Sequence, residues 1–525
     1  MKKLPIGIQT FSEIILDNYC YVDKTPLIYQ LVDEGKYYFL SRPRRFGKSL
    51  LISTLKSAFL GQQDLFKGLY LEKHWDWSVQ YPVIHISFGG GVIKNREILE
   101  KNIHAIIKEN AQNYAIEISQ DTLNFQFREL IQKLHNKYQQ KVVILVDEYD
   151  KPILDNITDI ALAKEIREGL KNIYSVIKDS DEYIKFAFLT GVSKFSKVSL
   201  FSGLNNLSDL TLDKQYATIC GYTETDIKTI FADYLDGVDF DELRKWYNGY
   251  NFLGEHVYNP YDVLLYLKNR EFNNYWFETG SPSFLIKLLQ EKQYYIPKLE
   301  QIQTRDTLLN RFEIEKIQIE TLLFQTGYLT IKNITRLGEN TFYQLGYPNQ
   351  EVRKSLTDYI LEGMIDQVLE KEDNSFALYT CLKEGQLNQL KAIFQAFFSS
   401  IPHHWYRKNQ LANYEGYYAS IVYCYFAALG LDVIPEDTTN KGQIDLTVKL
   451  NHQIFIIEFK VIELVEKTPT EEKTTQDKSN SALAQIHEKR YFEKYQHLNQ
   501  TIYLIGVEFS KEDRNIVNFQ WEQLN

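Results

Sequence analysis

Residues 36–59 read KYYFLSRPRRFGKSLLISTLKSAF. The stretch starts with an apolar run that is typical of a buried strand, and it ends with apolar residues at helical spacing. Between the two, Gly47, Lys48 and Ser49 would supply free backbone N–H groups, a lysine for the outer phosphates and a hydroxyl for magnesium. This order predicts an α/β core with a phosphate-binding loop for a nucleoside triphosphate.

The first half of the loop departs from the GxxxxGK[ST] pattern. Arg42 stands where that pattern has a glycine, and Pro43 removes one donor N–H. The positive charge of the next two arginines would offset the loss of the glycine and of this N–H donor. A basic loop that only caps the helix is the alternative interpretation. The residues expected to contact ATP or GTP here are Arg44, Arg45, Phe46, Gly47, Lys48 and Ser49.

Three more apolar runs predict strands, at residues 83–88, 142–146 and 184–189. Because helical stretches separate these runs, we expect a parallel sheet that is covered on both faces. In such a fold the ligand binds at the carboxyl ends of the strands. The side chains that directly follow the runs are therefore candidates for the site.

Asp147 and Glu148 directly follow one of these strands. The aspartate could order a metal shell and the glutamate could polarise the attacking water, as phosphoryl transfer requires. Two solvated acids at a strand end are the alternative, but they leave the order and spacing of the two motifs unexplained. Thr190, at the end of the next strand, could sense the terminal phosphate or be an ordinary turn residue. The candidates for donating charge to the transition state are Arg44, Arg45 and Arg244.

A second candidate site lies near the C-terminus, where Asp445 is followed by Glu458 and Lys460. Hydrolysis of a phosphodiester needs a metal held by carboxylates and a cation near the scissile phosphate. Alternate residues of a strand point the same way, so Glu458 and Lys460 could face one metal ion. A Glu and Lys pair on a solvated hairpin explains this spacing as well. The predicted order helix, strand, strand, helix in this region favours the metal site.

Composition is that of an ordinary globular protein, with 525 residues of which 44% are hydrophobic and 24% charged. The four cysteines lack CxxC spacing, which favours reduced thiols in the cytoplasm over a disulfide or zinc framework. No run of about 18 apolar residues occurs, so we expect neither membrane spanning nor secretion. Net charge is −10, and residues 401–525 hold 13 Lys and Arg against 17 Asp and Glu. Nucleic acid there must be gripped by metal ions, a few placed cations or another domain, because a general basic surface is missing.

Six segments spread over nearly the whole chain resemble the family of AAA-type ATPase-like proteins fused to a PD-(D/E)xK nuclease. The loop with Arg42 in place of glycine resembles the form that this loop takes in that family. The resemblance implies a bacterial or archaeal P-loop ATPase with a helical lid. The segments are YVDKT at 21–25, SRPRRFGKS at 41–49, DEYDKP at 147–152, TGVS at 190–193, WYNGY at 246–250 and LGYPN at 345–349.

The resemblance also implies a fold class, an α/β P-loop NTPase core with a parallel sheet and a helical lid region, followed by a restriction-endonuclease-like α/β domain. The pattern of apolar residues changes after about residue 216, and glycine and proline break the chain at 346–349. We therefore expect the ATPase core in residues 1–215, a helical lid or winged-helix-like region in 216–345, a helical connector in 346–400 and the nuclease domain in 401–525.

By the same resemblance, Asp445 and Glu458 would bind Mg²⁺ or Mn²⁺, and Glu415 would complete the cage. Lys460 would orient the nucleophile or stabilise the pentavalent phosphate. The usual proline before the aspartate of this signature is absent, because Ile444 stands there. The accessory positions of the fold are matched by Gln485 and Tyr491.

The expected function is nucleotide-regulated cleavage of DNA by an ATP-hydrolysing protein with a magnesium-dependent endonuclease domain, in genome defence or mobile-element biology. The alternative is a nucleotide-dependent switch or scaffold whose nuclease-like domain binds nucleic acid or protein without cutting. We expect ATP and DNA as partners, a cytoplasmic location and no membrane. The sequence leaves open a homo-oligomer, the choice between DNA and RNA, and the trigger.

Overall fold

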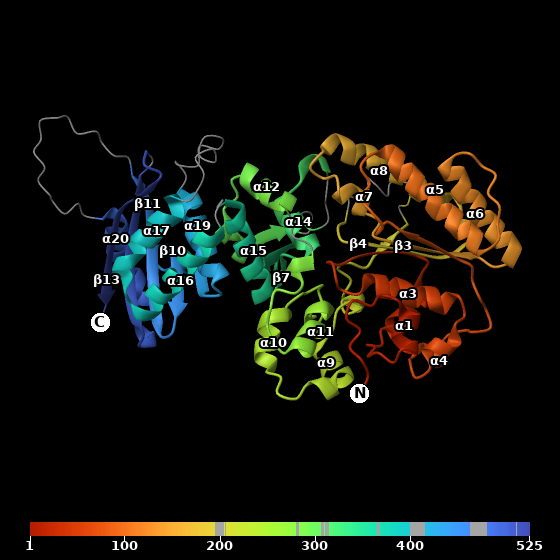
Figure 1. The fold of residues 1–525 in the computed structure, drawn as a ribbon, viewed down its shortest axis with the longest axis horizontal. Helices are drawn as coiled ribbons and strands as arrows, with labels where there is room; N and C mark the ends of the chain where they lie inside the picture. Colours follow the sequence, from red (N-terminus) through yellow and green to blue (C-terminus); the bar gives the residue numbers. More distant parts are fainter. Residues whose placement is uncertain are drawn as a thin grey trace, which may run out of the picture. The chain divides into compact units, whose positions relative to one another are not determined.

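The chain forms two compact units, residues 1–279 with 302–349 and residues 280–301 with 350–525. Figure 1 follows both units along the chain in sequence colours. The finer division into four segments remains a prediction. The computed structural model describes residues 1–194, 204, 206–279, 283–305, 309, 314–364, 368–399, 415–462, 480–510 and 512–524.

The first unit is built on a five-stranded parallel sheet in the order β2-β3-β4-β1-β5. The apolar runs predicted four of these strands correctly, and every residue of β1 and β3 is buried. The chain leaves β1 for the far edge of the sheet and later returns to β4, so these neighbours flank the switch point where a ligand crevice forms. The strands are β1 (Tyr37–Ser41), β2 (Val83–Ser87), β3 (Val142–Asp147), β4 (Ile184–Gly191) and β5 (Ser208–Asp209).

Helices cover both faces of this sheet, as expected for buried parallel strands. Helix α3 (Lys48–Phe59) lies on one face together with α1 (Phe11–Leu16). The other face carries α5 (Arg96–Asn113), α6 (Leu123–Tyr138) and α8 (Ile160–Asp179), which pack on one another (Figure 1). Each helix turns an apolar stripe inward, so α3 is held firmly where it follows the loop.

The rest of the first unit combines short helices with a small antiparallel sheet. Helices α9 (Glu224–Ile230), α10 (Phe240–Tyr247) and α11 (Pro260–Asn269) share an apolar core that is rich in tyrosine. Helix α14 (Ile319–Thr326) lies in the chain between the first and second strands of the sheet of order β6-β8-β7. Its strands are β6 (Ile302–Arg305), β7 (Thr330–Leu337) and β8 (Asn340–Gly346).

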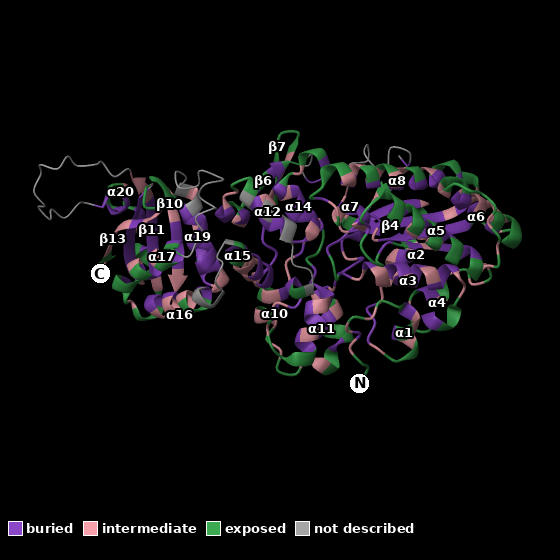
Figure 2. Cartoon of the chain, turned by 45° about the horizontal axis from the view of Figure 1, so that its top comes forward, coloured by how far each residue is buried: buried purple, intermediate pink, exposed green. Residues whose placement is uncertain are grey.

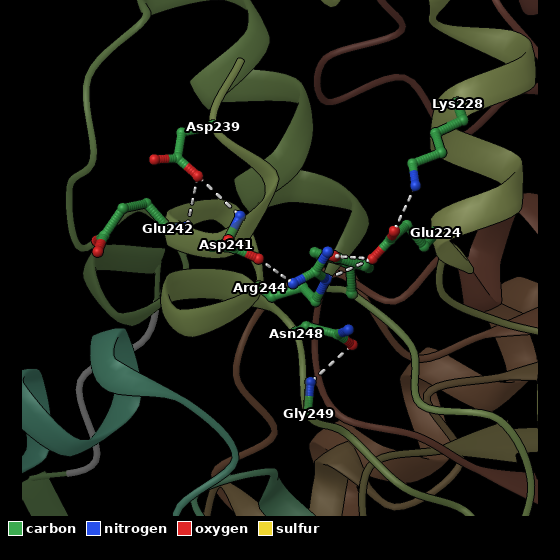
Figure 3. Close-up of polar contacts among 9 residues, drawn as sticks. Glu224, Lys228, Asp239, Asp241, Glu242, Arg244, Asn248 and Gly249 are labelled. Carbon is green, nitrogen blue, oxygen red and sulfur yellow. Dashed lines mark hydrogen bonds and ion pairs between the residues drawn. The ribbon is translucent and has the colours of Figure 1, made fainter.

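A glycine turn joins these two parts. Asn248 Oδ1 accepts the Gly249 N–H at 2.7 Å (Figure 3). Gly249 has φ +103°, and a Cβ there would press against the Pro348 carbonyl, which also accepts the Lys332 ammonium at 3.1 Å. Only glycine fits both the backbone angle and the close approach, so the segments WYNGY and LGYPN meet at this point.

The second unit contains a mixed five-stranded sheet in the order β13-β12-β11-β10-β9. Only β11 and β12 run parallel, and the other pairs are antiparallel. The strands are β9 (Asp432–Thr439), β10 (Gly442–Leu450), β11 (Gln453–Ile462), β12 (Thr501–Ser510) and β13 (Asn515–Leu524).

Two helices lie on opposite faces of this sheet. Helix α20 (Ser481–Lys489) packs on Ile502 and Leu504 of β12, while Phe509 of the same strand stacks on Tyr418 of α19 (Glu415–Ala428). Strands β11 and β12 and helix α19 are largely buried, while α20 has exposed residues on its outer side (Figure 2). The described residues of the unit also include the helices α12 (Ser283–Glu291), α15 (Gln350–Met364), α16 (Val368–Glu384) and α17 (Leu390–Ser399).

Candidate nucleotide site and nuclease site

The predicted phosphate-binding loop lies between β1 and α3. Gly47 has φ +92° and no atom within 4 Å of where a Cβ would stand, so the loop backbone is open at this point. The Lys48 ammonium is buried and donates to the carbonyls of Arg42 at 3.0 Å and Pro43 at 2.9 Å. Burial lowers the pKa of Lys48, and the nearby Asp147 carboxylate opposes that shift. The lysine is thus folded back on its own loop.

The Arg42 side chain packs under the phosphate-binding loop, on the side of the protein interior. This side chain is fully buried, donates to the carbonyls of Thr211 at 2.9 Å and Tyr216 at 3.2 Å, and stacks over the Phe252 ring at 3.8 Å. Burial lowers its pKa to about 10. The residue that replaces the usual glycine therefore supports the loop from below instead of facing a ligand.

Aromatic residues fix the loop from the side. Phe46 is fully buried and meets Tyr250 edge-on at 4.7 Å between ring centroids. Trp276 Nε1 donates to the Arg44 carbonyl at 3.0 Å. Phe46 is thus a packing residue of the loop, and the binding role predicted for it stays a prediction.

The carboxyl edge of the sheet brings the other predicted residues to the loop. Strand β4 lies between β1 and β3. Its residue Thr190 pairs with Leu40 of β1, and on the other side the end of β4 lies next to the end of β3. Asp147 is 6% exposed and accepts the Glu148 N–H at 3.0 Å. Among the described residues, the fully buried Thr190 hydroxyl has no hydrogen-bond partner. The strand register therefore brings the phosphate-binding loop, Asp147 with Glu148, and Thr190 to the same edge of the sheet.

Glu148 is half-buried and has left-handed backbone, with φ +53°. Burial and the adjacent Asp147 raise the pKa of Glu148, while Lys48 opposes the shift. A Cβ on Gly89 would lie 3.1 Å from Glu148 Oε2, so the glycine after β2 leaves room for this carboxylate. The carboxyl group is close to the loop lysine and is partly shielded from water.

A cavity of about 380 Å³ opens over the loop. Its walls include an N-terminal segment and residues near α11, which the sequence did not point to, because they are far apart along the chain. Lys24, which also lines the cavity, forms an ion pair with Asp226 of α9 at 2.8 Å. Of the predicted residues, Arg44, Arg45, Phe46, Gly47, Lys48, Ser49 and Glu148 line the cavity; the added lining residues include Pro5, Ile8, Gln9, Tyr222, Tyr261 and Leu264.

The three candidate arginines have different surroundings. Figure 3 shows Arg244 of α10 between two carboxylates, at 2.7 Å from Glu224 and 2.5 Å from Asp241. These carboxylates raise the pKa of Arg244. Arg44 and Arg45 line the cavity, and Arg45 stacks over Tyr261 at 4.9 Å. Geometry thus favours the two loop arginines over Arg244.

In the second unit, β10 and β11 bring the predicted carboxylates together. Asp445 accepts the Phe459 N–H at 2.8 Å, and its own N–H points to Glu458 Oε2 at 3.4 Å. Glu458 is 2% exposed and accepts the side-chain amide of Gln485 from α20. Burial raises the pKa of Asp445, while the Lys460 charge opposes the shift. Within the described stretches, Lys460 makes no ion pair, so its cation is available.

The third predicted ligand is not located. Glu415 is the first residue of α19, but its side chain lies outside the described part of the chain. Among the residues that are described, no group of three or more His, Cys, Asp or Glu could hold a metal ion. Asp445 and Glu458 form a pair, and a complete cage remains a prediction.

A buried glutamate near this pair was not found from the sequence. Glu508 of β12 pairs with Lys460 in the parallel register and is 4% exposed. Its carboxylate accepts the Ser481 N–H at 2.6 Å, which caps the start of α20, and the Asn518 amide at 2.8 Å. No motif marks Glu508, because its partners lie on separate elements. It orients the helix that carries Gln485.

None of the described helices is both long enough and apolar enough to cross a membrane.

Comparison with known proteins gives matches to both units. A family model described as a predicted AAA-ATPase matches residues 5–201, and the model of the PD-(D/E)XK nuclease superfamily matches residues 413–519. A protein of Azotobacter chroococcum mcd 1, described as an uncharacterized protein in the vnfD 5' region, is 51% identical over 524 residues, which cover 100% of this chain and 99% of that protein. The two matched segments contain the two candidate sites.

Proposed function

We propose that this chain, which belongs to the family of AAA-ATPase-like proteins with a PD-(D/E)XK nuclease superfamily domain, hydrolyses ATP and cleaves DNA under nucleotide control. The observation that carries the proposal is the sheet register of the first unit. It brings the phosphate-binding loop, Asp147 with Glu148, and Thr190 to one edge beside a cavity of about 380 Å³. Phosphoryl transfer needs these three kinds of group around one triphosphate.

In the ATPase reaction, Lys48 would exchange its two loop carbonyls for oxygens of the outer phosphates. Ser49 and Asp147 are oxygen donors of the kind that Mg²⁺ prefers, and they fit a shared ion. Bound Mg²⁺ would neutralise charge on the phosphates. Glu148 would accept the proton of the attacking water, and its raised pKa makes it a stronger base than an exposed glutamate. The Thr190 hydroxyl, which has no hydrogen-bond partner within the described part of the chain, would contact the terminal phosphate.

In the nuclease reaction, Asp445 and Glu458 supply adjacent hard oxygen donors, which fit Mg²⁺ or Mn²⁺. The ion would lower the pKa of a bound water and shield the phosphodiester charge. Gln485 would hold Glu458 in place by its amide contact. Lys460 would stabilise the extra negative charge at phosphorus, because its ammonium has no ion pair within the described residues. Glu415 would complete the ligand set.

Cleavage is tested with purified protein, Mg²⁺ or Mn²⁺, ATP and a panel of DNA and RNA forms. We expect the natural protein to cut DNA, and Asp445→Ala or Glu458→Ala to abolish cutting while ATP hydrolysis continues. Asp432→Ala is the matched control, since this exposed aspartate of β9 pairs with Lys449, four residues beyond Asp445 on β10. Binding of nucleic acid without any cutting by the natural protein would reject the nuclease and favour a nucleotide-dependent switch or scaffold.

A further inference from the structure

A buried carboxylate joins the loop after β3 to the end of β4. Asp150 is 1% exposed. Its carboxylate accepts the N–H of Val192 at 3.1 Å, the N–H of Ser193 at 2.5 Å and the hydroxyl of Ser193 at 2.6 Å. Burying a carboxylate is costly unless such donors surround it. This arrangement therefore binds the two chain segments together firmly.

Tyr149 strengthens the same link. Its backbone N–H donates to the Thr190 carbonyl at 3.1 Å, and its phenol donates to the Ser193 carbonyl at 2.9 Å. A Cβ on Gly191 would overlap both the Asp150 carboxylate and the Tyr149 ring. The glycine thus allows the two segments to approach to hydrogen-bonding distance.

The phosphate-binding loop is tied to the same four residues, 190–193. Ser41 donates its hydroxyl to the Val192 carbonyl at 2.5 Å, and the Arg42 N–H donates to the Gly191 carbonyl at 3.2 Å. The start of the loop, the end of β3 and the end of β4 are therefore connected through one short segment. A shift of that segment would move all three groups of the proposed site.

The direction of the Glu148 side chain depends on this connection between the ends of β3 and β4. In the described part of the chain its carboxylate has no hydrogen-bond partner, so its position is set by the left-handed backbone at φ +53°. The residues that follow it, Tyr149 and Asp150, are the ones anchored to β4. We propose that Asp150 is a positioning residue of the ATPase site, which holds Glu148 and Thr190 in the geometry for hydrolysis; this rests on the proposed ATP hydrolysis.

The test compares Asp150→Asn and Ser193→Ala with the natural protein. Asparagine keeps the size but turns an NH₂ group toward donors, while Ser193→Ala removes one bond of three. We expect ATP affinity to be kept, and kcat to fall by about 100-fold in Asp150→Asn, the scale of a small misplacement of a reacting group. The fall in kcat should be smaller in Ser193→Ala. Asp159→Asn is the control, because Asp159 is an exposed N-cap of α8 that asparagine also serves.

Amide hydrogen exchange separates positioning from other causes. Exchange at Val192 and Ser193 should become faster in Asp150→Asn, with the rest of the sheet unchanged. A natural kcat in Asp150→Asn, or parallel losses of affinity and kcat with general loss of protection, would overturn the inference. If the natural protein hydrolyses no ATP, the proposed function fails by itself. In that case, the positioning role would also be rejected if amide exchange in Asp150→Asn equalled exchange in the natural protein, both with ATP bound.

Discussion

At the scale of single residues, Lys48 carries the clearest prediction. Its ammonium is held by two carbonyls of its own loop, and a methyl group cannot bind phosphate oxygens in its place. Lys48→Ala should weaken ATP binding by about 100-fold, the scale of losing two charge-assisted hydrogen bonds. Calorimetry measures the affinity, with Lys56→Ala from the same helix as control. Equal ATP affinity in the natural protein and Lys48→Ala would reject the loop assignment.

Glu148 separates binding from turnover. Glutamine keeps the shape of the side chain but cannot take a proton from water. Glu148→Gln should bind ATP as the natural protein does, while its hydrolysis rate falls by about 100-fold or more, the scale of a lost general base. A phosphate-release assay measures the rate. Undiminished turnover would show that another group acts as the base.

Sequence reasoning identified the residues whose type is unusual for their position. Lys48 after a glycine and two acids at the end of an apolar strand are such signals, and the structure brings both to one edge. Arg42 could be noticed only as a departure from the glycine of the pattern, because its buried contacts with Thr211 and Tyr216 come from a distant segment. Glu508 and the cavity wall at Pro5 and Ile8 carried no such signal, since their surroundings come from distant segments.

At the scale of elements, the turn after α10 is open to a direct test. Gly249→Ala should lower the free energy of unfolding by about 1–3 kcal/mol for the strained backbone alone. The clash with the Pro348 carbonyl adds to that cost. Gly237→Ala is the matched control, because Gly237 has φ +70° with no atom within 4 Å. Equal losses for the two variants in denaturant titrations would show that the contact with Pro348 does not matter.

Trp276 should report on the loop. Its indole N–H binds the Arg44 carbonyl, next to the carbonyls that Lys48 would release when ATP binds. ATP should change the intrinsic fluorescence of the protein, and Trp276→Phe should remove most of that change while ATP still binds. Trp77→Phe is the control, since Trp77 packs on Phe66 and donates to Glu72. A full fluorescence response in Trp276→Phe would mean that another tryptophan gives the signal and that Trp276 does not report on the loop.

Among the elements, apolar strands were predictable and polar edge strands were not. The run from Val142 to Val146 is buried on both faces, so its composition alone indicates a central strand. The two residues of β5, the largely polar β9 and the mixed polar and apolar β13 lack such a continuous run. The helix at α20 ends at Lys489 because Arg490 adopts left-handed backbone, which side-chain periodicity does not reveal.

At the scale of the whole molecule, one stretch of chain belongs to the second unit although it interrupts the first. Residues 283–301 follow Trp276 in the chain and pack within the second unit. Glu300 accepts the Tyr423 hydroxyl of α19 at 2.6 Å, and Ile296 donates its N–H to Ser420 of the same helix at 3.2 Å. This helix begins at Glu415. The segment that follows Trp276 in the chain therefore takes part in the packing of α19 within the second unit.

The measurement that tests nucleotide control most directly is the rate of DNA cleavage without nucleotide, with ATP and with a non-hydrolysable analogue. A coupling free energy of about 1–3 kcal/mol between two sites predicts a change of about 5-fold to 150-fold among these conditions. Lys48→Ala should cut at one rate in all three. If the natural protein also cuts at the same rate in all three, the two sites are merely tethered, and nucleotide control is contradicted.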